Sequence, residues 1–191
     1  MRKIILASRS KARKRLLKQI GLKFEAVPSG IKEKRALKGS IEKLVKDNAL
    51  AKAKDVASRI KSGIVIGADT AVMAGNKLIG KPKNLKDAAK TLRILSTKPQ
   101  WVYSGIAVVD AASGKALTGS EKTLIYMSRI SGREIKNYFR KVSPLDKAGS
   151  FDIQGHGSVF IDRIEGCFYN VVGLPLAKLA KLLKKMDKDI L

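Results

Sequence analysis

A single aspartate at the end of an apolar segment is the residue best placed to do chemistry. Asp69 follows the run IVIGA at residues 64–68, which we expect to form a buried strand. Ligand sites in open α/β sheets gather at the carboxyl ends of strands, so this carboxylate is a candidate metal ligand or general base. A helix cap is the alternative, but no obvious helix follows directly.

A basic turn near the N-terminus could bind an anion. Residues 6–13 (LASRSKAR) predict a strand, a polar turn and the start of a helix. The N–H groups and positive dipole end of a helix N-terminus suit phosphate, and Ser8 and Arg13 would add a hydroxyl and a guanidinium. The competing interpretation is that Ser8 or Ser10 only caps the helix while the cations face water.

Two lysines occupy positions where they could face a bound anion. Lys52 lies on or beside the apolar stripe of a helix predicted from 41 to about 60, so it either extends to solvent or points into a pocket. Lys81 stands in the tripeptide GKP, where proline restricts the backbone and could aim the lysine.

The segment LDKAGSFDIQGHG, residues 145–157, has the composition of a ligand-binding loop. Its glycines allow close approach of the backbone to a ligand. Gln154 offers both a donor and an acceptor, as recognition of a base edge requires. An ordinary surface loop remains the alternative.

Several other chemistries are excluded by composition. His156 is the only histidine and Cys167 the only cysteine, so a multi-histidine zinc site and an internal disulfide are both impossible. Neither a GxxxxGK[ST] loop nor a GxGxxG motif occurs. The groups that are present suit hydrolysis of a phosphoanhydride, for which cations hold phosphate oxygens and a carboxylate places a metal or activates water. Such a metal should be hard and oxygen-bound, either Mg²⁺ or Mn²⁺.

The elements that must position these residues alternate between strand and helix, which predicts an α/β fold. We expect strands at 3–7, 24–27, 64–67, 77–80, 101–109, 116–127 and 158–164. We expect helices at 12–20, 41–60, 85–96, 132–141 and from about 175, with an irregular stretch at 144–155. With 191 residues, the chain suits one domain or two closely joined lobes, with a seam near 97–100.

The formal net charge of +24 favours polyanionic partners, although a solvated lysine-rich surface explains most of such an excess equally well. Aromatic residues make up only 5% of the chain, which weakens the case for nucleic-acid binding. The apolar run at residues 4–7 is too short for a signal peptide, and no run is long enough to span a membrane. We therefore expect a cytoplasmic protein that does not bind a membrane.

Taken together, these segments resemble the Maf family of nucleoside triphosphate pyrophosphatases over essentially the whole chain. The matching pieces are ILASRSKARKRLL, IGADTAV, IGKP, LDKAGSFDIQGHGSVFIDRIEG and NVVGLPL, in that order. The resemblance implies an elongated mixed β-sheet flanked by helices, with two lobes and a central cleft as in inosine triphosphate pyrophosphatases. It also implies a homodimer that needs Mg²⁺ or Mn²⁺. The expected activity is cleavage between the α- and β-phosphates, with roles in clearing nucleotides or arresting cell division.

The resemblance also assigns roles to individual residues. Asp69 matches the family's metal-associated proton acceptor, and Glu33 matches a second acidic position near the metal. Phosphate binding would fall to four residues, Ser8, Arg13, Lys52 and Lys81.

Three positions bear on the choice of base. Thr70 and Gln154 stand in the strings GADT and IQG, which resemble the branch acting on dTTP and UTP rather than the 7-methyl-GTP branch with GSDQ and SEG. Ala12 stands where the family usually has an arginine, a loss for which Lys11 or Arg9 could compensate. A modified-purine pyrophosphatase is therefore one alternative, and a basic nucleic-acid-binding protein without catalysis is another.

Overall fold

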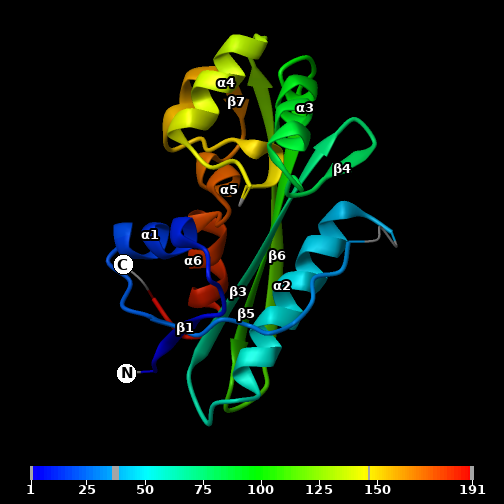
Figure 1. Cartoon of the computed structure of the whole chain (residues 1–191). Helices are drawn as coiled ribbons and strands as arrows, with labels where there is room; N and C mark the ends of the chain where they lie inside the picture. Colours follow the sequence, from blue (N-terminus) through cyan, green and yellow to red (C-terminus); the bar gives the residue numbers. More distant parts are fainter. Residues whose placement is uncertain (1, 36–38, 146, 190–191) are drawn as a thin grey trace. The chain divides into compact units, whose positions relative to one another are not determined.

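The computed structural model describes residues 2–35, 39–145 and 147–189 (Figure 1). Its strands are β1 (Ile4–Leu6), β2 (Glu25–Ala26), β3 (Ile64–Ala74), β4 (Lys77–Ile79), β5 (Gln100–Asp110), β6 (Ala116–Met127) and β7 (Ile161–Glu165). Its helices are α1 (Lys11–Gln19), α2 (Ile41–Ala57), α3 (Leu85–Leu95), α4 (Gly132–Lys141), α5 (Phe168–Val172) and α6 (Leu176–Lys184). Two short 3₁₀ helices, η1 (Ala148–Ser150) and η2 (His156–Phe160), precede β7.

The strands form one mixed sheet, as expected from the sequence. Their order is β2-β1-β3-β5-β6-β7, and β4 pairs with β3. β1 is parallel to both of its neighbours, and its Leu6 lies opposite Ile66 of β3. β4 is antiparallel to β3, and β7 is antiparallel to β6. Because β1 and β3 are parallel neighbours, the residues that follow Leu6 and those that follow Ile66 lie at the same end of this strand pair.

The chain divides into two compact units, each with its own core. The first comprises Met1–Thr70, Tyr103–Glu121 and Gly173–Leu191, and the second comprises Ala71–Val102 and Lys122–Val172. The first core is built largely from small side chains, Ile5, Ala7, Ala49, Ala53, Val56, Ala57, Val65, Ala107 and Val109. The second is built from larger ones, including Leu92, Leu95, Ile125, Ile135, Tyr138, Phe151 and Phe160.

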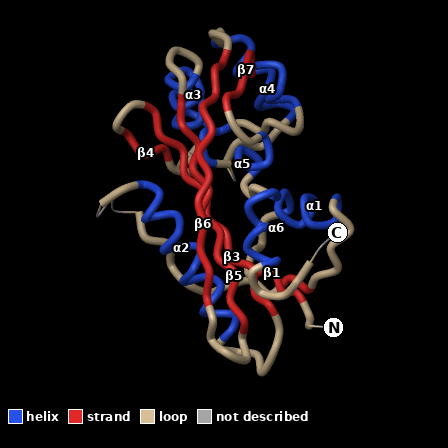
Figure 2. Tube along the Cα trace, turned by 180° about the vertical axis from the view of Figure 1, so that it is seen from behind, coloured by secondary structure: helices blue, strands red, loops and turns tan. Residues whose placement is uncertain are grey.

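Within the first unit, α2 lies on one side of the strands while α1 and α6 lie on the other (Figures 1 and 2). The approach of α2 is unusually close. A Cβ atom at Gly67 of β3 would lie 2.1 Å from the carbonyl oxygen of Ala49, and one at Gly105 of β5 would lie 2.2 Å from that of Val45. These two glycines therefore let the helix backbone rest directly on the strands, which fixes the polar residues of α2 relative to β3.

Replacing Gly67 by alanine should lower the free energy of unfolding by about 2–3 kcal/mol, because overpacking a core by one methyl group costs this much when backbone must move. Gly80→Ala is the matched control, since a Cβ there meets nothing within 4 Å. Urea unfolding followed by circular dichroism measures both variants. Equal midpoints for Gly67→Ala and Gly80→Ala would contradict the close packing.

Two strand predictions were wrong in extent. β3 continues to Ala74, so Asp69 lies inside a long strand and not at its carboxyl end. The residues after Thr70 are themselves β-forming, and the turn comes only at Gly75-Asn76. The second strand keeps only Glu25–Ala26 of the predicted residues 24–27.

The region after residue 150 also differs from expectation. Residues 158–160, predicted as the start of a strand, belong to η2, and β7 begins at Ile161. The Asp152 carboxylate accepts a hydrogen bond of 2.9 Å from the Gly157 amide, which closes a turn directly before the predicted strand. The short helix α5 was not predicted. None of the described helices combines the length and apolar character that a membrane span requires.

Candidate active site

Asp69 is a buried carboxylate whose two oxygens are both held by other side chains. Its exposed fraction is 7%. The Lys52 ammonium donates to Oδ1 at 2.7 Å, and the Asn48 amide donates to Oδ2 at 2.9 Å. A charge removed from water is tolerated only when it is paired and hydrogen-bonded, and both conditions hold here. The carboxylate is thus fixed in direction by two donors from one helix.

Helix α2 supplies both donors, because Asn48 and Lys52 are one turn apart on its buried face. Ser40 begins the helix by accepting a hydrogen bond from the Lys43 amide, as its sequence predicts. Lys52 does not extend to solvent: it is 8% exposed, and its ammonium also donates to the Ala68 carbonyl at 3.2 Å. The alternative left open for this lysine is therefore settled in favour of an inward-pointing cation.

Glu33 brings a second carboxylate to the same cation. Its Oε1 lies 2.7 Å from the Lys52 nitrogen, and its side chain is 44% exposed. The ammonium therefore bridges a buried carboxylate, Asp69, and a partly exposed one. The loop that contains Glu33 is held at the next residue, Lys34. The Lys34 amide donates to Asn48 Oδ1 at 2.9 Å, and the Lys34 carbonyl accepts from Asn48 Nδ2 at 3.0 Å.

Arg13 links α1 to three other parts of the first unit. Its Nε donates to the Gly173 carbonyl at 2.9 Å, and its two terminal nitrogens donate to Ser8 Oγ at 3.3 Å and Thr70 Oγ1 at 3.1 Å. Burial lowers the pKa of Arg13, while the negative charges of Asp69 and Glu33 act in the opposite direction. The guanidinium stays charged in proteins, so these carboxylates offset part of the cost of burying it.

The two serines of the first turn have separate tasks. Ser10 is the helix cap, since its hydroxyl accepts from the Arg13 amide at 3.3 Å. Ser8 is buried, and its hydroxyl accepts from the Ser10 amide at 3.2 Å as well as from Arg13. Ala12, where the resemblance led us to expect an arginine, is half-buried in α1, whereas Lys11 is exposed.

Thr70 is engaged by protein partners on several sides. Its hydroxyl lies 2.9 Å from that of Ser104 and accepts from Arg13. Gly173 packs against the same hydroxyl, since a Cβ atom there would lie 3.3 Å from Thr70 Oγ1 and the backbone has φ +112°. A side chain at Gly173 would therefore be both strained and crowded.

The remaining two candidates belong to the second unit. Lys81 follows β4 and is exposed, while the neighbouring Pro82 is buried. Gln154 is exposed in the turn that precedes η2. Six of the eight residues given roles by the resemblance, besides Ala12, thus lie together in the first unit: Ser8, Arg13, Glu33, Lys52, Asp69 and Thr70.

Sequence reasoning missed three contributors to this cluster. They are Asn48, the Ser104 hydroxyl and the Gly173 carbonyl. A signal for Asn48 was available, because a polar residue four positions before Lys52 falls on the same helix face. Ser104 and Gly173 are distant in sequence from their partners, Thr70 and Arg13, and no local sequence pattern predicts such contacts.

Comparison with known proteins identifies the family. A family model described as Maf-like protein matches residues 3–186. The chain belongs to the Maf family. A protein from Methanosarcina barkeri named dTTP/UTP pyrophosphatase is 45% identical over 100% of this chain and 97% of its own length. Proteins of the same name from Caldicellulosiruptor saccharolyticus and Clostridium perfringens are 40% and 43% identical, covering 100% and 99% of this chain and 98% and 100% of their own.

A solved structure of a nucleoside-triphosphatase, a dITP/XTP pyrophosphatase from Mycobacterium abscessus, is also similar to this Maf-family chain. The match covers 67% of this chain and 75% of that one, at 21% identity and a TM-score of 0.43.

Two acidic residues of this Maf-family site, Asp69 and Glu33, meet at the Lys52 ammonium. Across residues 2–35, 39–145 and 147–189, no three or more His, Cys, Asp or Glu side chains are grouped to hold a metal. Asp69 and Glu33 nonetheless approach one nitrogen at 2.7 Å each, so two carboxylates already surround a single cation. Mg²⁺ is commonly held by one or two carboxylates together with substrate phosphates, and the structure supplies the two carboxylates of such a donor set.

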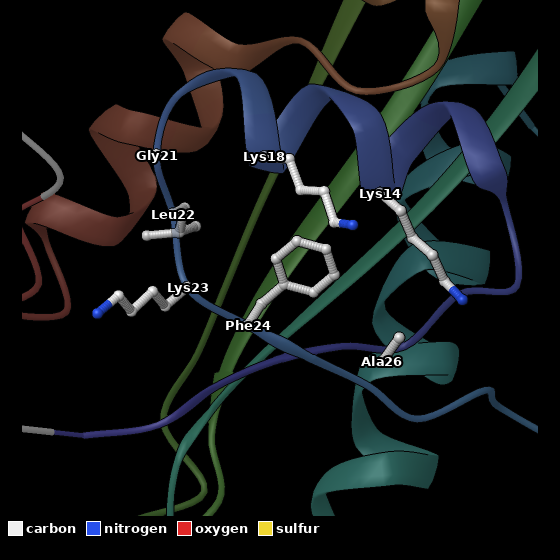
Figure 3. Close-up of a pocket in the computed structure, with 7 residues that line it drawn as sticks. All are labelled: Lys14, Lys18, Gly21, Leu22, Lys23, Phe24 and Ala26. Atoms are coloured by element: carbon white, nitrogen blue, oxygen red, sulfur yellow. The ribbon is translucent and has the colours of Figure 1, made fainter.

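A separate pocket of about 540 Å³ lies beside α1 and is lined by Lys14, Lys18, Gly21, Leu22, Lys23, Phe24 and Ala26 (Figure 3). Lys14 and Lys18 extend from one face of α1, on the side where the ring of Phe24 lies, and Lys23 points away (Figure 3). None of the candidate residues of the Maf-family site lines this pocket. Its cations and its aromatic ring therefore form a second, distinct feature of the first unit.

Proposed function

We propose that this Maf-family chain hydrolyses nucleoside triphosphates between the α- and β-phosphates, releasing a monophosphate and pyrophosphate. The main structural support is the buried Asp69 carboxylate, which accepts hydrogen bonds from Lys52 and Asn48 and lies in the same unit as Arg13. The names of the relatives support the same activity, and those relatives match over nearly their full length.

Phosphate binding would rest on the cations of this cluster. Each terminal nitrogen of Arg13 has two N–H groups, one of which donates to Ser8 or Thr70. The second N–H group on each nitrogen is the proposed donor to a phosphate oxygen. Lys52 already lies between two anions and would exchange part of that contact for phosphate. Lys81, exposed at the end of β4, is the further cation that the resemblance assigns to phosphate.

Asp69 would act as the proton acceptor. As water adds to phosphorus, the bond to the bridging oxygen breaks, pyrophosphate leaves with the bonding electrons, and the water's proton passes to the carboxylate. The hydrogen bonds from Lys52 and Asn48 hold the carboxylate oxygens in fixed directions before the reaction begins. Such preorganisation is a general source of rate enhancement, since no reorientation is needed in the transition state.

We also propose a dependence on Mg²⁺ or Mn²⁺, with Asp69 and Glu33 as the protein ligands. When bound, the ion would neutralise charge on the phosphate oxygens and leaving group. The partly exposed position of Glu33 leaves its carboxylate accessible to an ion that arrives with the nucleotide.

The proposed substrates are dTTP and UTP. The strings around Thr70 and Gln154 and the names of the relatives both favour them. A panel of common and modified nucleoside triphosphates, each with Mg²⁺ or Mn²⁺, should give the highest pyrophosphate release per enzyme with dTTP or UTP. Preference for 7-methyl-GTP would instead indicate that Ala12 has moved the specificity to modified purines.

One observation favours a second candidate function, binding of single-stranded nucleic acid. The pocket beside α1 combines three lysines with Phe24, and an aromatic ring with nearby cations can stack a base and hold its phosphates. The net charge of +24 would assist this binding. Tight, strongly salt-dependent binding of a labelled oligothymidylate without pyrophosphate release would favour this candidate over the enzyme.

Three further expectations from the sequence analysis remain predictions. They are a homodimer, a cytoplasmic location and a role in clearing nucleotides or arresting cell division. Sedimentation velocity on the purified chain would test the first directly.

A further inference from the structure

Asn48 is a buried amide on the face of α2 that also carries Lys52. It is 3% exposed. Its Nδ2 donates to Asp69 Oδ2 at 2.9 Å and to the Lys34 carbonyl at 3.0 Å, and its Oδ1 accepts from the Lys34 amide at 2.9 Å. The Lys34 amide can only donate, so it requires the oxygen of Asn48 on its side. The side-chain amide of Asn48 therefore has a single orientation in which all three of these hydrogen bonds form.

These contacts join the two acidic residues of the site. One hydrogen bond is to the Asp69 carboxylate, and the other two are to the backbone of Lys34, the residue directly after Glu33. Apart from Lys52, the buried residues around Asn48 on this helix, including Val45 and Ala49, are apolar and pack in the core. A buried amide costs stability unless all its hydrogen bonds are made, so packing alone gives no reason for asparagine here.

We propose that Asn48 is a positioning residue, which sets the placement of Asp69 and of the Glu33 loop relative to each other. The proposal rests on the proposed function, because its consequence is for phosphoanhydride hydrolysis. Asn48 does not touch the reacting atoms. It acts by fixing one oxygen of the proton acceptor and the backbone beside the second acidic residue, so that both carboxylates meet the substrate in one geometry.

Kinetics of three variants test this role. Asn48→Ala should lower kcat by about 10–100-fold, the usual effect of losing a hydrogen bond that orients a catalytic or metal-binding group, with KM for dTTP changed less than threefold. Asn48→Asp has nearly the same shape but replaces the donor facing Asp69 with a carboxylate, so its kcat should fall further. Asn137→Ala, an exposed asparagine on α4, is the matched control and should keep wild-type kinetics.

A second measurement does not depend on catalysis. Hydrogen exchange in peptides covering residues 29–35 should be faster in Asn48→Ala than in wild type, because the Lys34 amide loses its acceptor. Exchange in α4 should not change. A loop that only packs against α2, without being held by Asn48, would show no such local difference.

The outcomes separate this proposal from the function on which it rests. If wild type releases pyrophosphate and both Asn48 variants keep kcat within twofold, or if loop exchange is unchanged, the positioning role is overturned. If wild type hydrolyses no nucleoside triphosphate, the proposed function fails and its catalytic consequence fails with it. In that case, faster exchange at residues 29–35 would support the anchoring of the loop alone.

Discussion

Asp69→Asn is expected to lower turnover by at least ~100-fold, the usual scale for a positioned acid–base group. The amide cannot accept the proton of the attacking water at neutral pH. It also presents an N–H₂ group where a second acceptor is needed, because Lys52 and Asn48 both donate to this side chain. Pyrophosphate release from dTTP at saturating substrate measures the loss.

The control for this variant is Asp47→Asn on the same helix. The Asp47 side chain is 39% exposed, and its carboxylate forms a salt bridge of 2.8 Å with Lys43. Its replacement should leave turnover unchanged. Circular dichroism should show that both variants are folded. Near wild-type turnover for folded Asp69→Asn would remove Asp69 from the mechanism.

Lys52→Met should destabilise the protein by about 3–5 kcal/mol, which is the typical cost of removing one partner from a buried ion pair. The Lys52 and Asp69 side chains are each 10% exposed, so water cannot replace the missing partner well. The change also removes a proposed phosphate ligand, and activity should fall together with stability. Urea unfolding followed by circular dichroism measures the first effect separately from the second.

Two companion variants show whether the lost ion pair is the cause. Lys54→Met alters an exposed lysine two residues away on α2 and should cost little. The double variant Lys52→Met with Asp69→Leu removes both charges and should be more stable than Lys52→Met alone. Equal destabilisation of the single and double variants would show that the cost comes from packing and not from an unpaired carboxylate.

Local signals in the sequence predicted correctly where α2, α3 and α4 begin. Ser40 and Asn84 cap α2 and α3 with their side chains, and Ser131 forms the predicted capping box with Glu134. Each of these signals depends on residues within one helical turn, so neighbouring sequence contains all the information needed. The inward direction of Lys52, in contrast, was left open by the sequence, because helical spacing alone cannot distinguish a lysine in a pocket from one that extends along an apolar face.

The sequence could not predict which distant groups complete the site. Asn48 matters because Gly67 and Gly105 bring α2 onto the strands, and that approach depends on tertiary packing. Asp69 was expected at a strand end because IVIGA is followed by two polar residues, but pairing with β4 extends β3 to Ala74. Strand ends depend on their pairing partners as well as on their own residues, so single-sequence patterns place them poorly.

The most direct test of the central claim is the identity of the products from dTTP. Anion-exchange chromatography of a reaction with Mg²⁺ or Mn²⁺ separates thymidine monophosphate, thymidine diphosphate, pyrophosphate and phosphate. Hydrolysis between the α- and β-phosphates predicts monophosphate and pyrophosphate in equal amounts, both abolished in Asp69→Asn. Diphosphate with inorganic phosphate, or no product from dTTP or any other nucleoside triphosphate, would contradict the account.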